Sequence, residues 1–252
     1  MIHGVFLKNN FLLLGGSGTL GKAITKSKLF KNLKHPSSKK VNILSKNKIE
    51  NFLIKNNINI IIHCAAMARV KECEENKKKA YKINVIGTKN IVDVIKNIQK
   101  KNKKRIKLIF MSTDGVYASI KGNYKETDIL KPYNYYGQTK LKAEQQVKKL
   151  DSYLIIRTRF FNKNKIKFTY SATNIFTSAL EVNSLVKYLY KIIKKEYNGI
   201  LNIGGKKVSD FERYYKFNKK VMPCDKSKIF NELNFKIATD ASLNLKKFKK
   251  LL

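Results

Sequence analysis

A glycine-rich segment, residues 15–21, constrains the fold of this chain more than any other stretch. It reads GGSGTLG, it follows the apolar run 10–16 (NFLLLGG), and residues 19–30 after it have helical spacing. In such a strand–turn–helix unit the first glycine allows a tight turn, the second lets backbone approach a pyrophosphate, and the third lets the helix pack on the strand. A plain glycine-rich loop is the simpler alternative. We favour a nucleotide-binding turn formed by Gly15, Ser17, Gly18, Thr19, Leu20 and Gly21.

Apolar and helical segments alternate along the first 160 residues. The apolar runs that predict buried strands are 58–64 (INIIIHC), 106–112 (IKLIFMS) and 153–157 (YLIIR). The segments with helical character are 45–55, 74–101 and 133–149. Buried strands that alternate with helices form a parallel sheet covered on both faces. We therefore expect an α/β fold built on a doubly wound, Rossmann-like parallel sheet.

The alternation weakens toward the C-terminus. Residues 180–194 keep helical spacing, and residues 200–203 (ILNI) have the character of a strand. No Gly/Pro-rich linker separates two independent domains. We expect residues 1–160 to form a dinucleotide-binding Rossmann-like domain and residues 161–252 a small C-terminal α/β substrate-binding lobe, interleaved with the sheet near 200–205.

Apolar runs and cysteines indicate the compartment. No run reaches the ~20 residues that a membrane-spanning helix needs, and residues 1–10 lack the long apolar segment of a secretory signal. Cys64, Cys73 and Cys224 lack paired spacing, so we expect neither a disulfide framework nor a zinc site. These features are typical of a protein of the reducing cytoplasm.

The net charge of +37, from 54 Lys and Arg against 17 Asp and Glu, favours nucleic acid or an anionic membrane as partner if it is taken alone. Only five of the 54 are Arg, the better bidentate reader of phosphates and bases, and the lysines are spread along the whole chain. We interpret the charge as a coding bias on a solvated surface, residues 246–250 included. We therefore expect no membrane partner and no specific nucleic acid, with weak binding of nucleic acids that falls steeply with salt.

The segment that should read the cofactor ribose contains no acid. A dinucleotide fold that prefers NAD places Asp or Glu after its second strand, whereas no acid lies between Gly21 and Glu50. Residues 35–40 instead read HPSSKK, within a polar loop or weak strand. Hydroxyl and ammonium groups suit a 2′-phosphate. We therefore predict NADPH, with Ser37 and Lys39 near that phosphate, while NADH stays open.

Two further strand ends carry small or hydroxylated residues. Cys64 ends the apolar run 58–64, and Ala65 and Ala66 follow it. Small side chains at this position let a cofactor lie against the sheet edge. Ser112 and Thr113 end the run 106–112. We expect these residues at the same edge of the sheet as the glycine turn, because the carboxyl ends of parallel strands share one edge.

Tyr136 and Lys140 are four residues apart, so both face the same side of a helix. A phenol titrates near ~10, too high for proton transfer at neutral pH, and a neighbouring ammonium lowers its pKa. Lys140 can also hold the nicotinamide ribose, and Thr113 can donate a hydrogen bond to a substrate oxygen. The pair is informative through its distance from the glycine turn and from Thr113, since Tyr and Lys are common in this chain.

The ordered set GGSGTLG, HCAA, Asn84 within a long helix, STD and PxxxYGxxK resembles the extended short-chain dehydrogenase/reductase superfamily over residues 10–160. Residues 112–145 resemble its dTDP-4-dehydrorhamnose reductase group, with Gly122-x-Tyr124-x-Glu126-x-Asp128 before the tyrosine. The resemblance implies a 4-keto sugar nucleotide as substrate and NAD(P)H as hydride donor. It implies the catalytic residues Thr113, Tyr136 and Lys140, with Asn84 supporting the site and Asn84, Ser112, Tyr136 and Lys140 also beside the cofactor.

Several alternatives remain within this resemblance. Sugar-nucleotide 4,6-dehydratases carry Thr-Asp-Glu at the strand end, and Gly115 stands where that Glu would be, which argues against dehydration. An epimerase would use the same residues and keep its cofactor oxidised and bound. A related branch serves as a regulatory subunit of methionine adenosyltransferase, so a non-catalytic role stays open, as do a magnesium requirement and a homodimer.

Three polar residues are expected to be structural. His63 lies in an apolar strand and is expected to be a satisfied strand-end histidine. Glu144 and Glu181 are expected to be helix-face acids.

Overall fold

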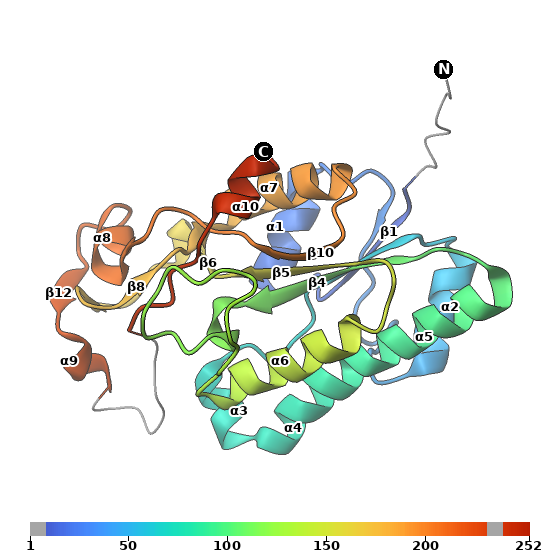
Figure 1. Cartoon of the computed structure of the whole chain (residues 1–252), viewed down its shortest axis with the longest axis horizontal. Helices are drawn as coiled ribbons and strands as arrows, with labels where there is room; N and C mark the ends of the chain where they lie inside the picture. The colour runs from blue at the N-terminus through green and yellow to red at the C-terminus, as the bar shows by residue number, and fades with distance from the viewer. Residues whose placement is uncertain (1–8, 231–238) are drawn as a thin grey trace.

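The computed structural model describes residues 9–230 and 239–252 (Figure 1). Its centre is a six-stranded sheet in the order β10-β5-β4-β3-β1-β2, and every neighbouring pair is parallel. The strands are β1 (Phe11–Leu14), β2 (Leu33–Lys34), β3 (Ile60–His63), β4 (Lys107–Thr113), β5 (Tyr153–Thr158) and β10 (Gly199–Asn202). The expected α/β, doubly wound architecture is confirmed. The expectation about a secretory signal falls mainly on residues 1–8, outside the described residues.

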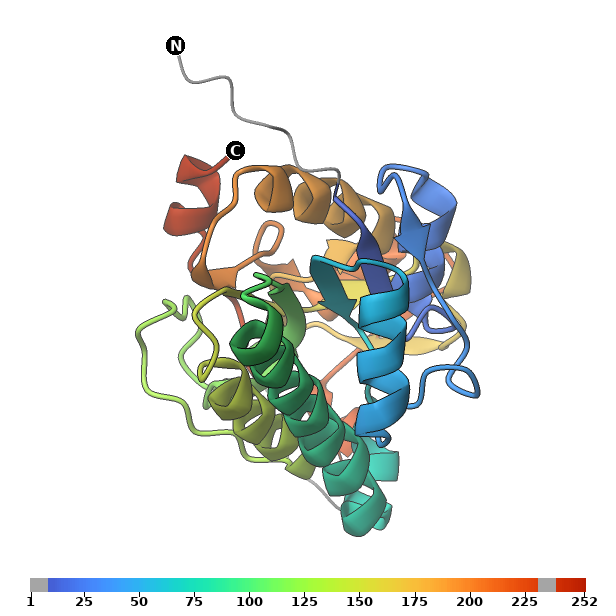
Figure 2. The same cartoon turned by 90° about the vertical axis from the view of Figure 1, so that its right-hand side faces the viewer.

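Helices cover both faces of the sheet, which lies between two helical layers in Figure 2. One layer holds α1 (Thr19–Ser27), α7 (Val182–Lys194) and α10 (Lys246–Lys250), and the other α2 (Lys46–Lys55), α5 (Gly87–Asn102) and α6 (Tyr135–Val147). Strand β1 shows why the layers differ, because its alternate residues point to opposite faces. Leu13 packs with α1 and α7, whereas Leu12 packs with α2 and α5. No helix in the described ranges is long and apolar enough to cross a membrane.

The continuous helix expected over 74–101 is wrong in detail. The chain forms α3 (Val70–Glu75), α4 (Lys77–Tyr81), a π-helical turn (Lys82–Ile86) and then α5. The break has a local cause, because the side chain of Asn76 accepts a hydrogen bond from the Lys79 amide and caps α4. The π turn places Asn84 in the buried interior.

Short elements after β5 form the lobe at the left of Figure 1. Strand pairs are β6 (Phe160–Phe161) with β9 (Leu180–Glu181), β7 (Tyr170–Ala172) with β12 (Met222–Cys224), and β8 (Phe176–Thr177) with β11 (Val208–Ser209). Helices α8 (Asp210–Tyr215) and α9 (Lys226–Phe230) and a 3-10 turn at Lys163–Lys165 accompany them, whereas the 3-10 turn Asp114–Val116 directly follows β4. The chain rejoins the sheet through β10, and α7 and α10 pack on the core of the sheet.

The two acids expected on helix faces differ in their positions. Glu181 is the N-cap of α7, where its carboxylate accepts hydrogen bonds from the amides of Asn183 and Ser184. Glu144 is fully buried, and its Oε2 lies 2.7 Å from Nη2 of Arg157. Glu144 therefore lies on a helix, as expected, but on its buried face, whereas the expectation of a helix-face position is wrong for Glu181, which caps the start of a helix.

Candidate active site

A groove of about 700 Å³ opens at the carboxyl ends of β1 and β3, beside the glycine turn. Gly15 adopts φ +89, and a Cβ there would lie 2.5 Å from the Ala65 amide nitrogen. A Cβ on Gly21 would overlap the Gly15 carbonyl oxygen, so α1 approaches the turn more closely than any side chain allows. Both positions require glycine for the packing of the turn.

The start of α1 fits a pyrophosphate. Its N-cap is Gly18, which lines the groove, and no side chain within the described ranges caps the helix. The first N–H groups of the helix are therefore left for a ligand, at the end that favours negative charge. A Cβ on Gly18 would meet nothing closer than the Gly15 carbonyl oxygen at 3.5 Å. Gly18 thus leaves open space for a ligand, whereas the missing Cβ atoms of Gly15 and Gly21 allow close packing of neighbouring backbone.

Seven of the fifteen predicted cofactor residues line this groove: Gly15, Ser17, Gly18, Ser37, Cys64, Ala65 and Ala66. Thr19, Leu20 and Gly21 form the first turn of α1 and would contribute backbone N–H groups. Lys39 is exposed and is not among the lining residues. Residues 35–38, which belong to the predicted ribose-reading segment, line the wall, whereas sequence reasoning missed Val41, Asn42, Ile43, Leu44 and Ile83. The brief apolar patch at 41–44 was the available signal.

The segment predicted to read the cofactor ribose follows β2. This strand ends at Lys34, and residues 35–38 then line the groove. The turn is closed by the Ser37 carbonyl, which accepts hydrogen bonds from the amides of Lys40 and Val41 at 3.0 Å. No Asp or Glu stands among the described residues that line the groove.

Helix α6 brings Tyr136 and Lys140 to the end of β4. The Asn134 side chain caps α6 by accepting a hydrogen bond from the Gly137 amide at 2.8 Å. Gly137 packs directly on the carbonyl of Gly115, where a Cβ would overlap it. The first turn of α6 therefore rests on the turn that follows Thr113. Asp114 in that turn is close enough to Tyr136 to raise the pKa of its phenol.

The pKa of Tyr136 is raised, first by burial and then by Asp114 and Cys73, while Arg159 lowers it. This is the opposite of the direction expected from Lys140. The Lys140 ammonium lies 3.9 Å from the centre of the Phe110 ring. In the protein without ligands, the expectation that Lys140 lowers the phenol's pKa is therefore wrong.

Lys140 is itself strongly perturbed. Burial lowers its pKa to about 8, although Glu144 and Cys64 act in the opposite direction. Cys64 lines the groove, whereas Lys140 is not among the lining residues. The same burial raises the pKa of Cys64 to about 12, so its thiol stays protonated and is no nucleophile.

His63 is a buried neutral imidazole. Burial and then Lys140 lower its pKa to about 3. Its Nε2 lies 3.0 Å from Oγ1 of Thr88, while Nδ1 has no hydrogen-bond partner among the described residues. The expectation of a satisfied histidine therefore holds for one ring nitrogen only.

Asn84 connects the groove to α6. Its amide group donates to the Met67 carbonyl at 3.0 Å and to Oγ1 of Thr139 at 2.9 Å, and its oxygen accepts from the Met67 amide at 2.8 Å. Thr139 precedes Lys140, so Asn84 fixes the helix that carries Tyr136 and Lys140. This arrangement favours the predicted supporting role over direct contact with a cofactor.

Ser112 is not among the residues that line the groove, and its hydroxyl donates to the buried Glu144 at 2.6 Å. Thr113, the next residue, accepts a hydrogen bond from the Gly115 amide at 3.1 Å and donates to Oδ1 of Asp114 at 3.1 Å. The two hydroxyls therefore lie on opposite sides of β4, as neighbouring strand residues must.

The fold and the site together define a Rossmann-like protein of the extended short-chain dehydrogenase/reductase type, with Thr113, Tyr136 and Lys140 at the sheet edge. The family model "RmlD substrate binding domain" matches residues 9–183. The chain belongs to this family.

Known proteins agree with this assignment. A hypothetical dTDP-4-dehydrorhamnose reductase from Sulfolobus tokodaii superposes with a TM-score of 0.82 at 29% identity, covering 96% of this chain and 94% of that one. The dTDP-4-dehydrorhamnose reductase of Bacillus anthracis, in complex with NADP, gives 0.85 at 22% identity, covering 97% and 93%, and shows the shared fold.

A curated relative is similar over a shorter stretch. Methionine adenosyltransferase 2 subunit beta from Bos taurus is 30% identical over 145 residues, which are 54% of this chain and 42% of that protein. The match therefore spans less than half of the length of the curated relative.

Replacing Gly18 by Ala is expected to weaken cofactor binding about tenfold or more, because a methyl group would hold the phosphates away from charge-assisted N–H donors. The thermal midpoint should not change, since the new Cβ has room. Gly21→Ala is the contrasting variant: its overlap with backbone should cost about 1–3 kcal/mol of stability. Fluorescence titration with NADPH and thermal unfolding test both. Normal cofactor affinity in Gly18→Ala would contradict the assigned turn.

Proposed function

We propose that this protein reduces the 4-keto group of a nucleotide-activated deoxysugar, with NADPH as the hydride donor. The observation that carries the proposal is the meeting of two sites at one sheet edge. Cys64 lines the groove and also acts on the pKa of Lys140, while Asp114, the residue after Thr113, acts on the pKa of Tyr136. Family membership and the reductases with this fold support it.

The residues divide the work as follows. NADPH, when bound, supplies a hydride to the carbonyl carbon. Tyr136 donates its phenolic proton to the carbonyl oxygen, and Thr113 donates a hydrogen bond to the same oxygen. Burial keeps Tyr136 protonated and therefore able to act as an acid. Lys140 holds the nicotinamide ribose with its ammonium, and Asn84 keeps α6 in place.

Two other functions remain as outcomes of the test. An epimerase would convert the sugar without net consumption of NADPH. A cofactor-binding regulatory protein, as the similarity to subunit beta of a methionine adenosyltransferase suggests, would bind NADPH and turn nothing over. Gly115 in place of an acid argues against dehydration.

The proposal is tested by incubating the protein with NADPH and a panel of 4-keto sugar nucleotides while following the absorbance of the reduced nicotinamide. Oxidation of NADPH that requires the sugar nucleotide supports a reductase. Sugar conversion without that oxidation indicates an epimerase. Binding of NADPH without either reaction would contradict the enzymatic proposal.

NADPH is expected to bind more tightly than NADH, and the difference should shrink as salt rises. The hydroxyl of Ser37 lines the groove where no acid is found, and the basic residues nearby are solvated and screened by salt. Dissociation constants for both cofactors at two salt concentrations measure this. Ser37→Ala should narrow the preference, with Lys100→Ala as a distant control. Equal constants at low salt would contradict NADPH as the preferred cofactor.

Turnover is expected to fall as pH rises above about 8, the lowered pKa of Lys140. Below that value the side chain keeps its proton, and above it the neutral amine holds the ribose less well. The rate as a function of pH, at saturating substrate, shows the decline. Residual activity in Lys140→Arg should lack it, because Arg stays charged. If the turnover rate of the wild type stays constant as the pH rises above about 8, Lys140 does not have the assigned role.

We also propose that residues 1–160 carry the cofactor and residues 161–252 mainly the sugar nucleotide, with β10 returned to the sheet. A reducing cytoplasm is the proposed location, supported by the unpaired state of Cys64, Cys73 and Cys224. No cluster of His, Cys, Asp and Glu that could hold a metal occurs in the described ranges.

A further inference from the structure

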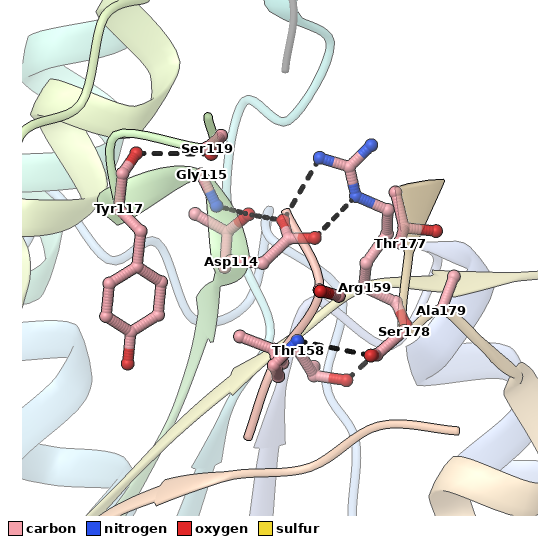
Figure 3. A network of polar contacts seen from close by, with 12 residues as sticks. Asp114, Gly115, Tyr117, Ser119, Thr158, Arg159, Thr177, Ser178 and Ala179 are labelled. Atoms are coloured by element: carbon pink, nitrogen blue, oxygen red, sulfur yellow. Dashed lines mark hydrogen bonds and ion pairs between the residues drawn. The ribbon is translucent and has the colours of Figure 1, made fainter. Parts of the chain in front are cut away.

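Arg159, the residue after β5, grips the carboxylate next to Thr113. Its Nε lies 2.7 Å from Oδ2 of Asp114 and its Nη2 lies 3.2 Å from Oδ1, so both oxygens are held (Figure 3). The Asp114 side chain is 1% exposed, whereas that of Arg159 is 34% exposed. The ion pair therefore has a buried acidic end and a basic end open toward solvent.

The same carboxylate holds the hydroxyl of Thr113. Oγ1 of Thr113 lies 3.1 Å from Oδ1 of Asp114 and accepts a hydrogen bond from the Gly115 amide at 3.1 Å. A threonine hydroxyl has one proton to donate. In the protein without substrate, that proton is committed to Asp114 and not to a substrate oxygen.

We propose that Arg159 is a positioning residue that frees the Thr113 hydroxyl for the substrate carbonyl. The inference rests on the proposed function, in which Thr113 donates to that carbonyl. When the carbonyl arrives, the hydroxyl rotates from Asp114 to the substrate, and Asp114 keeps its two charge-assisted hydrogen bonds from Arg159. Arg159 thereby lowers the free-energy cost of moving the Thr113 hydrogen bond from Asp114 to the substrate.

The argument depends on the cost of a buried unpaired charge. A carboxylate removed from water must keep hydrogen-bond donors, and charge-assisted donors are the strongest. Without Arg159, Thr113 would be the remaining side-chain donor that the described structure gives to Asp114. The carboxylate would then retain the threonine proton and compete with the substrate carbonyl for it.

Arg159 is also tied to the lobe, so its position depends on more than Asp114. Its carbonyl accepts a hydrogen bond from the Leu180 amide at 2.9 Å. Asp210 and Tyr214 on α8 lie close enough to raise the pKa of the guanidinium further. Contacts with both the sheet and the lobe therefore position the guanidinium of Arg159.

The test compares kcat in four proteins: wild type, Arg159→Met, Asp114→Asn and the double variant. Arg159→Met should lower kcat by about ten- to a hundredfold, the value of a hydrogen bond to a charged group, with little change in NADPH affinity. Adding Asp114→Asn should restore most of that loss, because a neutral amide oxygen holds the threonine proton weakly. A merely structural ion pair predicts no such recovery in kcat.

Arg159→Lys serves as the second variant. It keeps the positive charge but lacks the paired N–H donors of the guanidinium, so it should give an intermediate kcat. Thermal midpoints identify loss of folding, and the double variant carries no unpaired buried charge. Wild-type kcat in Arg159→Met overturns the inference, and so does a double variant no faster than Arg159→Met. A wild type that oxidises no NADPH with any sugar nucleotide overturns the proposed function itself, and this inference with it.

Discussion

Tyr136→Phe is expected to reduce turnover by about 10²–10⁴-fold, the usual contribution of a positioned proton donor. The substitution removes one hydroxyl and almost no volume, so helix α6 and the groove should be unchanged. Burial and Asp114 raise the pKa of the phenol, so at neutral pH the wild-type residue carries the proton that the reaction needs. NADPH affinity should therefore stay nearly constant while kcat falls.

Tyr135→Phe is the matched control, since Tyr135 is the preceding residue of the same helix and is also partly buried. Its ring lies near the ammonium of Lys77, away from the assigned chemistry. Steady-state rates and cofactor titrations for both variants give the comparison. If Tyr136→Phe turns over at the wild-type rate, another residue must supply the proton.

Arg157→Met is expected to destabilise the protein by about 3–5 kcal/mol, because it leaves the buried Glu144 carboxylate without its cation. Both oxygens of Glu144 accept from Arg157, at 3.0 and 2.7 Å, and Nη1 of Arg157 also bonds the Tyr117 hydroxyl at 2.9 Å. The pair links α6 to β5, and Glu144 lies one helical turn after Lys140 on α6.

Lys46→Met provides the control, because the Lys46–Asp93 pair is half exposed on its basic side. Breaking an exposed pair changes stability by about 1 kcal/mol or less. Chemical unfolding of the variants gives the difference. If Arg157→Met loses no more stability than Lys46→Met, the network beneath α6 does not stabilise the fold in the way described.

The local motifs of the site could be derived from the sequence because each reflects a demand of nearby backbone. Gly15 needs a positive φ, and Gly21 needs the absence of a Cβ. The apolar runs located β1, β3, β4 and β5, because strands buried on both faces are apolar throughout. These features involve residues within a turn or two of one another, where spacing and residue type are sufficient.

The helix boundaries near Asn84 were harder to derive. An apolar stripe continues through residues 74–101, so periodicity alone predicts one helix. The break at Asn76 depends on a side chain that caps the next segment, and the π turn depends on burying the amide of Asn84 against Met67 and Thr139. A hydrophobic pattern does not report either contact.

The amino-acid order alone was enough to predict the parallel sheet, the glycine-rich turn between β1 and α1 and the pairing of Tyr136 with Lys140 on one helix face, because these follow from short-range spacing. Tertiary structure decided which charges meet. Arg157 lies 13 residues from Glu144 and Arg159 lies 45 residues from Asp114, and in each pair the partners stand on different elements. Such pairings follow from sheet order and helix placement, so no local pattern distinguishes these side chains from the solvated charges elsewhere in the chain.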